Sequence, residues 1–136
     1  MEFFEEGLKL HELGKFEEAI NHYDRAISAK LDDALLYFSK GDSLVELKRY
    51  EEAIECFYQA ISIKPDYAAA YMNKGNALGY LERHEEAIEC FDQAISLKPD
   101  DALTYYNKGK SLHELKRHEE AIKCFDQAIS LESNYA

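Results

Sequence analysis

The feature that most restricts the fold of this chain is a repeat with a period of 34 residues. Four glycines follow this period, at Gly7, Gly41, Gly75 and Gly109. Two columns of alanine and one of aromatic residues keep the same spacing: Ala19, Ala53, Ala87 and Ala121; Ala26, Ala60, Ala94 and Ala128; and Tyr23, Phe57, Phe91 and Phe125. A constant period along the whole chain indicates an array of one structural unit.

Each repeat contains two amphipathic helices. In the second repeat, Tyr37, Gly41 and Leu44 recur at steps of four and three residues, which places them on one face of a helix. After Tyr50 a second set follows a similar spacing and includes Ala53, Ile54, Phe57, Ala60 and Ile61. Only a short turn around residues 47–50 separates the two patterns, so we expect the two helices to be antiparallel neighbours.

The glycine that recurs in every repeat is explained by helix packing. A glycine inside a helix costs about 1 kcal/mol relative to alanine, so its return in every repeat predicts a close approach of two helices. We expect the aromatic column, such as Phe57, to fill the space that Gly41 leaves. Between repeats, Pro65 and Pro99 end one helix, and the aspartates that follow them suit the N-cap of the next helix.

These columns resemble the tetratricopeptide repeat, whose pattern is W-x2-L-G-x2-Y, then A-x3-F, then P. The third repeat shows the match at Tyr71, Gly75, Leu78, Ala87, Phe91 and Pro99. Leu31 and Ser133 replace the proline in the first and last repeats. The resemblance implies an all-α fold: a right-handed solenoid of about eight helices in one domain, residues 1–136. Its repeats would cover 1–33, 34–67, 68–101 and 102–135, with no C-terminal capping helix.

Composition narrows the function. The formal net charge of −11 disfavours nucleic acid, whose binding needs clustered lysine and arginine. No run of residues approaches the 18 or so apolar residues of a membrane helix, and the start MEFFEEGLKL lacks the positive region of a signal peptide. We therefore expect a cytoplasmic protein that binds neither nucleic acid nor membrane.

Catalytic and metal sites are not favoured. Cys56, Cys90 and Cys124 are one repeat apart, and no C-x2-C pair is present, so we interpret them as packing residues rather than as metal ligands or a disulfide. His84 and His118 occupy a column that holds Phe16 and Tyr50, which favours a packing role for their rings. With no phosphate loop or recognisable nucleophile, we expect no enzyme activity, no cofactor and no metal.

In proteins with this repeat, the first helix of each repeat lines a groove that holds a segment of a partner protein. The resemblance places the following residues on that face: Phe4, Leu8, Leu35, Phe38, Asp42, Met72, Asn73, Asn76, Tyr106, Asn107 and Lys110. The row Phe4, Phe38, Met72 and Tyr106 is apolar in every repeat and predicts exposed anchors for the partner. As the alternative, Phe38 and Tyr106 only cover the neighbouring first helix.

The nature of the partner follows from charge. Tetratricopeptide modules that bind acidic chaperone tails use lysine, arginine and asparagine as a carboxylate clamp, and the clamp's cations are missing at the matching positions of this chain. Acidic residues such as Asp42, Glu46 and Glu114 lie near the groove instead. We therefore expect a neutral or basic segment rather than an acidic tail.

A second function class remains open at the C-terminal repeat. Apolar side chains that can pack on a following repeat elsewhere have no following repeat here. These self-association candidates are Ile122, Phe125, Ile129 and Leu131. They predict either a structural module that forms a homodimer through this end, as the alternative to peptide binding, or a longer parent protein whose next helix covers them.

Overall fold

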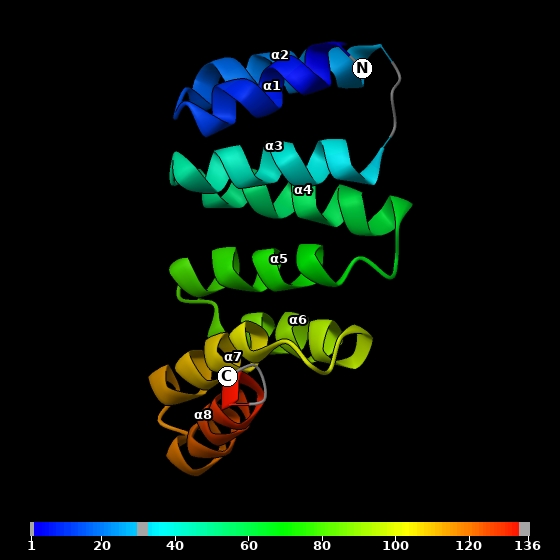
Figure 1. Cartoon of the computed structure of the whole chain (residues 1–136). Coiled ribbons are helices and arrows are strands. Elements are labelled where there is room, and N and C mark those ends of the chain that lie inside the picture. Colours follow the sequence, from blue (N-terminus) through cyan, green and yellow to red (C-terminus); the bar gives the residue numbers. More distant parts are fainter. Residues whose placement is uncertain (1, 30–32, 134–136) are drawn as a thin grey trace. The chain divides into compact units, whose positions relative to one another are not determined.

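The computed structural model describes residues 2–29 and 33–133 and contains, within them, eight α-helices and no strand (Figure 1). The helices are α1 (Glu2–Glu12), α2 (Phe16–Ser28), α3 (Ala34–Glu46), α4 (Tyr50–Ile63), α5 (Ala68–Tyr80), α6 (His84–Leu97), α7 (Ala102–Glu114) and α8 (His118–Ser133). The predicted all-α architecture of antiparallel helix pairs is confirmed. Leu31, which stands at the place of a proline, and the tail at residues 134–136 lie outside the described residues.

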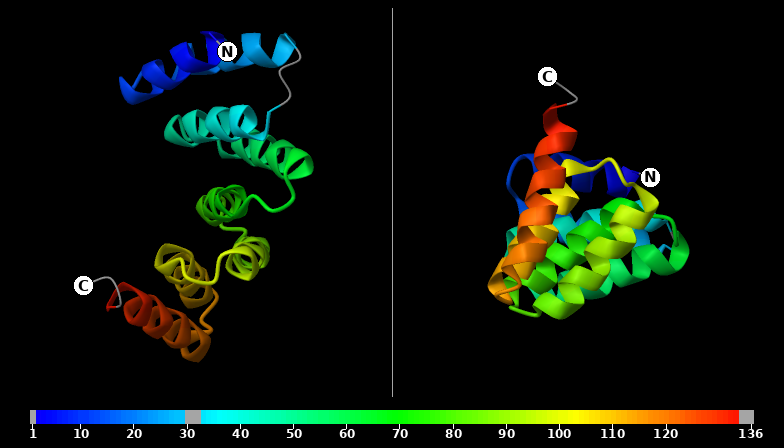
Figure 2. Two further views of the ribbon diagram at one scale, coloured as in Figure 1. Left: turned by 45° about the vertical axis from the view of Figure 1, so that its right-hand side comes forward. Right: turned by 90° about the horizontal axis from the view of Figure 1, so that it is seen from below.

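The chain divides into two compact units, Met1–Pro65 and Asp66–Ala136. In the first unit α1 packs on α2, α3 packs on α4, and α2 packs on α3. The second unit repeats this order, with α5 on α6, α7 on α8, and α6 on α7. Figure 2 shows the members of these pairs side by side from two further directions. Each unit therefore contains two successive repeats joined through the second helix of one and the first helix of the next.

Each pair is held by a contact between its glycine and its aromatic ring. A Cβ atom added to Gly75 of α5 would lie 2.6 Å from Cε1 of Phe91 on α6, and Phe91 is buried. The other three repeats show the same contact at 2.5 Å: Gly7 with Tyr23, Gly41 with Phe57 and Gly109 with Phe125. The predicted close approach of the two helices is confirmed, because any side chain at the glycine would displace the ring.

The turn inside each pair is also the same four times. In the second repeat the Arg49 N–H donates to the Leu44 carbonyl and the Lys48 N–H donates to the Val45 carbonyl, with Lys48 in the left-handed region at φ 60°. This is a Schellman motif, which satisfies carbonyls at the end of the first helix. The equivalent residues Gly14, Glu82 and Lys116 have φ values of 77°, 61° and 62°.

The predicted aspartate caps are right at one repeat boundary and wrong at the other. The Leu103 N–H donates to the Asp101 side chain at 3.2 Å, so Asp101 caps α7. Asp66 does not cap α5, because the N-cap position belongs to Tyr67, which makes no side-chain cap bond. Only one aspartate follows Pro65, whereas two follow Pro99, and the capping position is the second residue after the proline. At the start of α3, the Asp33 side chain accepts from the Leu35 N–H.

The core of each unit joins its two repeats. In the first unit Ile20 of α2 packs with Leu44 of α3 and with Cys56 and Phe57 of α4. The matching cluster of the second unit contains Ile88, Leu112, Ala121 and Cys124, with Phe125 packed against it. Cys56 and Cys124 thus lie in apolar clusters, as the packing interpretation predicts. Burial raises the pKa of the Cys56 thiol to about 11, which keeps it protonated and weakly nucleophilic at neutral pH.

Tyr23 is the one tyrosine in the aromatic column, and its hydroxyl has no partner at hydrogen-bond geometry among the described residues. Burial raises the pKa of Tyr23 to about 12; the charge of Asp42 adds to this effect, and Ser43 and Ser39 nearby partly offset it. A phenol that is buried in its neutral form opposes ionisation in the folded state. The first unit therefore carries a polar atom that the second unit, with Phe91, lacks.

Two glycines of α5 provide a matched test of the helix contact. We expect Gly75→Ala to lower the free energy of unfolding by about 1–3 kcal/mol, because the added methyl group collides with the buried Phe91 ring. Gly79→Ala should raise it by about 0.5 kcal/mol, since nothing lies within 4 Å of a Cβ there and alanine favours the helix. Urea unfolding measures both. Equal effects of the two substitutions would contradict this assignment.

For Tyr23→Phe we expect a gain in unfolding free energy of about 1 kcal/mol at pH 7, since an unsatisfied buried hydroxyl is removed. The folded-state pKa of Tyr23 lies above the ordinary value of 10.0, so the wild type loses stability as the pH rises from 10 towards 12. The variant lacks this loss. Its advantage in urea unfolding should therefore be larger at pH 11 than at pH 8, and an advantage that shrinks at pH 11 would be the opposite result.

Candidate functional site

The second unit contains a pocket of about 540 Å³ between α5, α6 and α7. One wall comes from α5 and consists of Gly75, Asn76, Gly79 and Tyr80. The opposite wall comes from α7 and consists of Leu103, Asn107, Lys110, Ser111 and Glu114. His84 and Phe91 of α6 and Glu82 of the turn complete the lining. The volume lies in the range of pockets that bind small molecules or side chains.

Gly79 accounts for the position of the pocket. The other repeats have a side chain at this place, namely His11, Val45 and His113. A Cβ atom added to Gly79 meets no atom within 4 Å, so the space beside it is open. The pocket therefore lies beside the one position of this column that carries no side chain.

The polar groups of the pocket can make hydrogen bonds. Asn107 is only 6% exposed, yet it lines the pocket together with Asn76, and each amide can donate and accept. Nδ1 of His84 is buried and has no hydrogen-bond partner among the described residues. Nζ of Lys110 lies 5.1 Å from the centre of the Tyr106 ring, a cation–π contact at the edge of the surface. A ligand in the pocket thus meets donors and acceptors as well as apolar walls.

Three of the sequence-predicted residues meet at this pocket, namely Asn76, Asn107 and Lys110. Met72 and Asn73 are half-buried on α5 and do not line it. Sequence reasoning missed the contributions of Gly79, His84 and Ser111. The substitution of glycine for histidine or valine in the column of Gly79 was the signal that could have revealed them.

The predicted row of exposed apolar anchors, Phe4, Phe38, Met72 and Tyr106, needs a correction at Phe4. Phe4 is only 6% exposed, because its ring packs against Tyr23 with centroids 6.0 Å apart. Phe38 is half-buried, and its ring packs at 5.8 Å against Phe57 of α4, the second helix of its own repeat, whereas the covering alternative places it against the neighbouring first helix. Tyr106 contacts Phe125 at 5.7 Å but remains 47% exposed. In the second unit the row thus presents an exposed ring, whereas Phe4 belongs to the core of the first unit.

The remaining predicted residues of the first unit lie on α1 and α3. Leu8 and Leu35 are 38% and 44% exposed, and Asp42 is partly exposed. His11, at the place of Gly79, fills the space between these helices: its Nδ1 is hydrogen-bonded to Oγ of Ser43 at 2.8 Å. At this position the first unit therefore carries a side chain bonded across to α3, whereas the second unit has open space beside Gly79.

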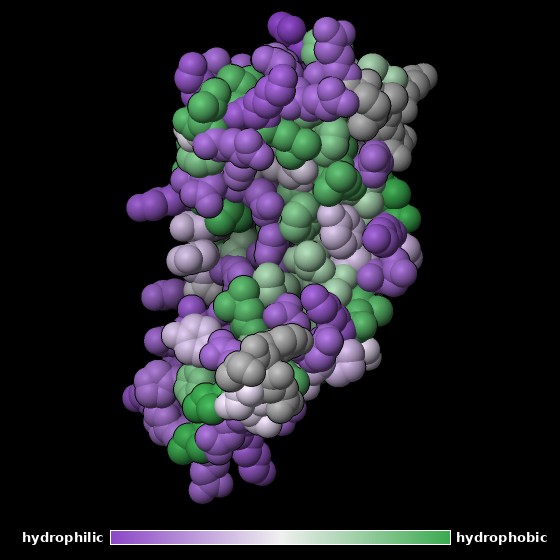
Figure 3. Space-filling view, in the orientation of Figure 1, coloured by the Kyte–Doolittle hydropathy of each residue, from purple (hydrophilic) through white to green (hydrophobic). Residues whose placement is uncertain are grey.

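The face of α8 carries the predicted self-association residues. Ile122 and Ile129 are 57% and 62% exposed, and Phe125 and Leu131 are half-buried. In the view of Figure 3, hydrophilic side chains predominate around the α7–α8 pair, with apolar patches between them. Since Ile122 and Ile129 are seven residues apart, they lie on the same side of the helix.

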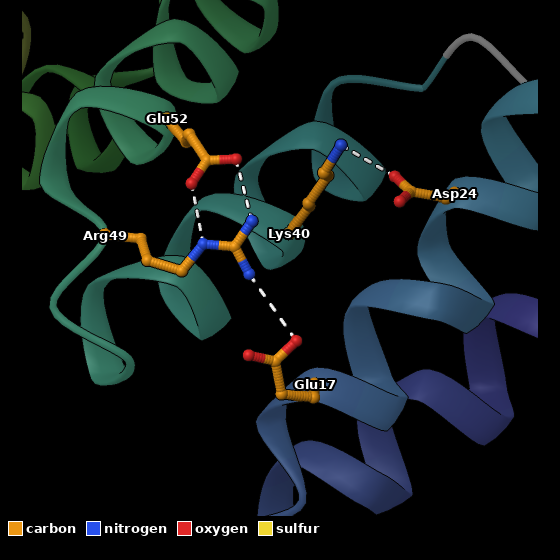
Figure 4. A network of polar contacts seen from close by, with 5 residues as sticks. All are labelled: Glu17, Asp24, Lys40, Arg49 and Glu52. Atoms are coloured by element: carbon orange, nitrogen blue, oxygen red, sulfur yellow. Dashed lines mark hydrogen bonds and ion pairs between the residues drawn. The ribbon is translucent and has the colours of Figure 1, made fainter.

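Basic residues near the helix starts form ion pairs with carboxylates, as Figure 4 shows for the first unit. Arg49 donates two hydrogen bonds to Glu52, at 2.6 and 2.7 Å, and one to Glu17 of α2 at 3.5 Å. Lys40 of α3 pairs with Asp24 of α2 at 2.6 Å. The guanidinium of Arg49 holds the pKa of Glu52 below its usual value. These bonds tie one repeat to the next.

The second unit repeats the arrangement. Arg117 donates to Glu120 and lies 3.8 Å from Glu85, and Lys108 pairs with Asp92 at 2.6 Å.

Within the described residues, no group of three or more metal-ligating side chains is placed to hold an ion. No described helix has the length and apolar character needed to cross a membrane.

Comparisons with known proteins agree with this architecture. Solved structures of MamA superpose on the chain; one has a TM-score of 0.94 at 24% identity and covers 98% of this chain and 78% of its own. MamA from Desulfovibrio magneticus RS-1 has a TM-score of 0.92 at 23% identity and covers 97% of this chain and 75% of its own. At these identities the likeness concerns the fold alone. No curated protein sequence matches the chain.

Family models match nearly the whole sequence. A model described as tetratricopeptide repeat matches residues 68–101 and 102–135. A second model, described as TPR repeat, matches residues 7–46 and 41–81. Together with the helix pairs and the glycine–aromatic contacts, these matches show that the chain belongs to the tetratricopeptide repeat family.

Proposed function

We propose that this chain binds a segment of a partner protein on the surface that α5 and α7 form around the pocket. The family supports a protein–protein interaction module in general terms. The observation that carries the finer proposal is the pocket itself, because it opens between two first helices and joins Asn76, Asn107 and Lys110.

The chemistry of this surface suits a peptide. Leu103 and Tyr80, which line the pocket, are 51% and 65% exposed, and they offer apolar area to a partner side chain. The amides of Asn76 and Asn107 can bond to both the N–H and the carbonyl of a peptide backbone. A surface that combines apolar anchors with a few hydrogen-bonding groups is typical of interface hot spots.

Charge favours a neutral or basic segment. Glu82 and Glu114 line the pocket, against one lysine, Lys110. The chain as a whole has a formal charge of −11, so a basic segment is attracted before contact and an acidic one is repelled.

Two leucines of the second unit allow a matched test. Peptides selected from a random displayed library on the intact chain should be neutral or basic, and Leu103→Ala should weaken their binding by about tenfold, as loss of a central apolar contact does. Leu97→Ala removes a leucine of similar exposure, 41%, on α6 outside the pocket and should have little effect. Isothermal titration calorimetry measures both. If Leu97→Ala weakens binding as much as Leu103→Ala, the peptide lies elsewhere.

Self-association through α8 is the second candidate, favoured by the exposure of Ile122 and Ile129 on one side of that helix. If this face forms a homodimer, the mass measured by light scattering should rise with protein concentration in the wild type. Ile129→Glu should keep the chain monomeric, because dimerisation would then bury unpaired carboxylates. A wild type that is monomeric at millimolar concentration would rule out this candidate and leave peptide binding untouched.

A further inference from the structure

The first unit shows how the pocket of the second unit looks when it is filled. The two units correspond with a shift of 68 residues, that is, two repeats. Under this shift, Ser43 matches Ser111, Phe16 matches His84, and His11 matches Gly79. The glycine–aromatic contact is the same in both, Gly7 with Tyr23 and Gly75 with Phe91. The first unit is thus an internal reference for the second.

In the first unit an imidazole ring occupies the place in question. The His11 ring lies 5.0 Å from the Phe16 ring, edge to face at 68°. Its Nδ1 shares a hydrogen bond with Oγ of Ser43 at 2.8 Å. The ring therefore makes one aromatic contact, with α2, and one polar contact, with α3. Repeat four contains the same kind of ring pair, His113 with His118, at 5.1 Å and 60°.

In the second unit the surroundings of that ring remain but the ring is missing. Ser111 and His84 both line the pocket, and the position of His11 is taken by Gly79, beside which there is open space. The Nδ1 atom of His84 is buried with no hydrogen-bond partner among the described residues. The His84 ring therefore stands where the Phe16 ring packs against His11 in the first unit, and Ser111 stands where Ser43 bonds to it.

We infer that the pocket receives one planar aromatic side chain with a hydrogen-bonding edge, histidine, tyrosine or tryptophan, from the bound partner segment. The ring takes the place that His11 holds in the first unit, packs edge to face with His84 and forms a hydrogen bond with Ser111. This inference rests on the proposed function and deepens it, since it names the side chain by which the segment is recognised.

Other classes of side chain fit the pocket less well. An aliphatic side chain would leave the Ser111 hydroxyl without the partner that Ser43 has in His11, and unpaired buried polar groups discriminate strongly against such ligands. A carboxylate would meet Glu82 and Glu114 on the lining. A ring with a donor or acceptor on its edge satisfies both conditions.

The test uses the intact chain and single-residue probes. N-acetyl-tyrosine amide, N-acetyl-histidine amide and N-acetyl-leucine amide are titrated into the protein while backbone amide signals are followed by NMR. We expect the tyrosine and histidine probes to shift the signals of Asn76, Gly79 and Asn107 saturably, in the millimolar range. The leucine probe should bind at least about tenfold more weakly, the difference that about 1.4 kcal/mol gives.

Substitutions at Gly79 separate filling of the pocket from damage to the fold. Gly79→His restores the ring that the first unit has and should abolish the shifts of the aromatic probes. Gly79→Ala adds only a methyl group in open space and should retain most of the binding. Thermal unfolding of both variants checks that they fold like the wild type. In reverse, His11→Ala should open a second site and add saturable shifts at Ser43.

The outcomes divide clearly. Equal binding of the leucine probe, or aromatic binding that survives Gly79→His in a folded protein, would overturn the inference. Library peptides that depend on Leu103 but contain no aromatic ring and tolerate Gly79→His would also overturn it, while the proposed function would stand. Failure to select any peptide would overturn both.

Discussion

The contact on which this structure depends is that between a glycine of the first helix and an aromatic ring of the second. At Gly75 a Cβ atom would stand 2.6 Å from the Phe91 ring, and the other three repeats are as close. The ring sits where a side chain would be, so the two helices approach until backbone and ring touch. Because this contact and the Schellman turn recur four times, the geometry of a pair does not depend on the residues that vary between repeats.

Residues outside the glycine–aromatic contact can differ between repeats without changing that contact. The column that contains His11, Val45, Gly79 and His113 lies four residues after the contact glycine, outside the contact itself. A change there leaves the glycine–aromatic contact in place and alters the contacts near the ends of the helices. Gly79 is such a position: it lines the pocket of about 540 Å³, and nothing lies within 4 Å of a Cβ atom added there. We therefore expect a substitution in this column to alter the proposed binding surface with little loss of stability.

The fold was predictable from the sequence because its signals are periodic. Glycine and aromatic columns, two helical patterns and a short turn determine each pair locally, and Asp101 caps α7 as expected. Burial on the outer faces was not predictable in the same way. Phe4 was assigned to the binding face by family resemblance, yet it packs on Tyr23, because its exposure depends on how the helices of one unit cover one another. The pocket was missed because the repeats differ at many surface positions, and the sequence alone does not show that the glycine at position 79 leaves open space beside it.

The two units share the same helix contacts and ion pairs but differ in the side chains on their first helices. Both have an arginine that bonds to the glutamate three residues later and a lysine that pairs with an aspartate at 2.6 Å, so the links between their repeats are alike. On the first helices, however, Leu8 is replaced by Asn76 and Asp42 by Lys110. These exchanges turn an apolar, acidic surface closed by His11 into a polar, open one. Since the helix contacts are the same in both units, the difference cannot come from how the helices pack. It comes from a few side chains around Gly79, which is why recognition by this chain is best sought on the second unit.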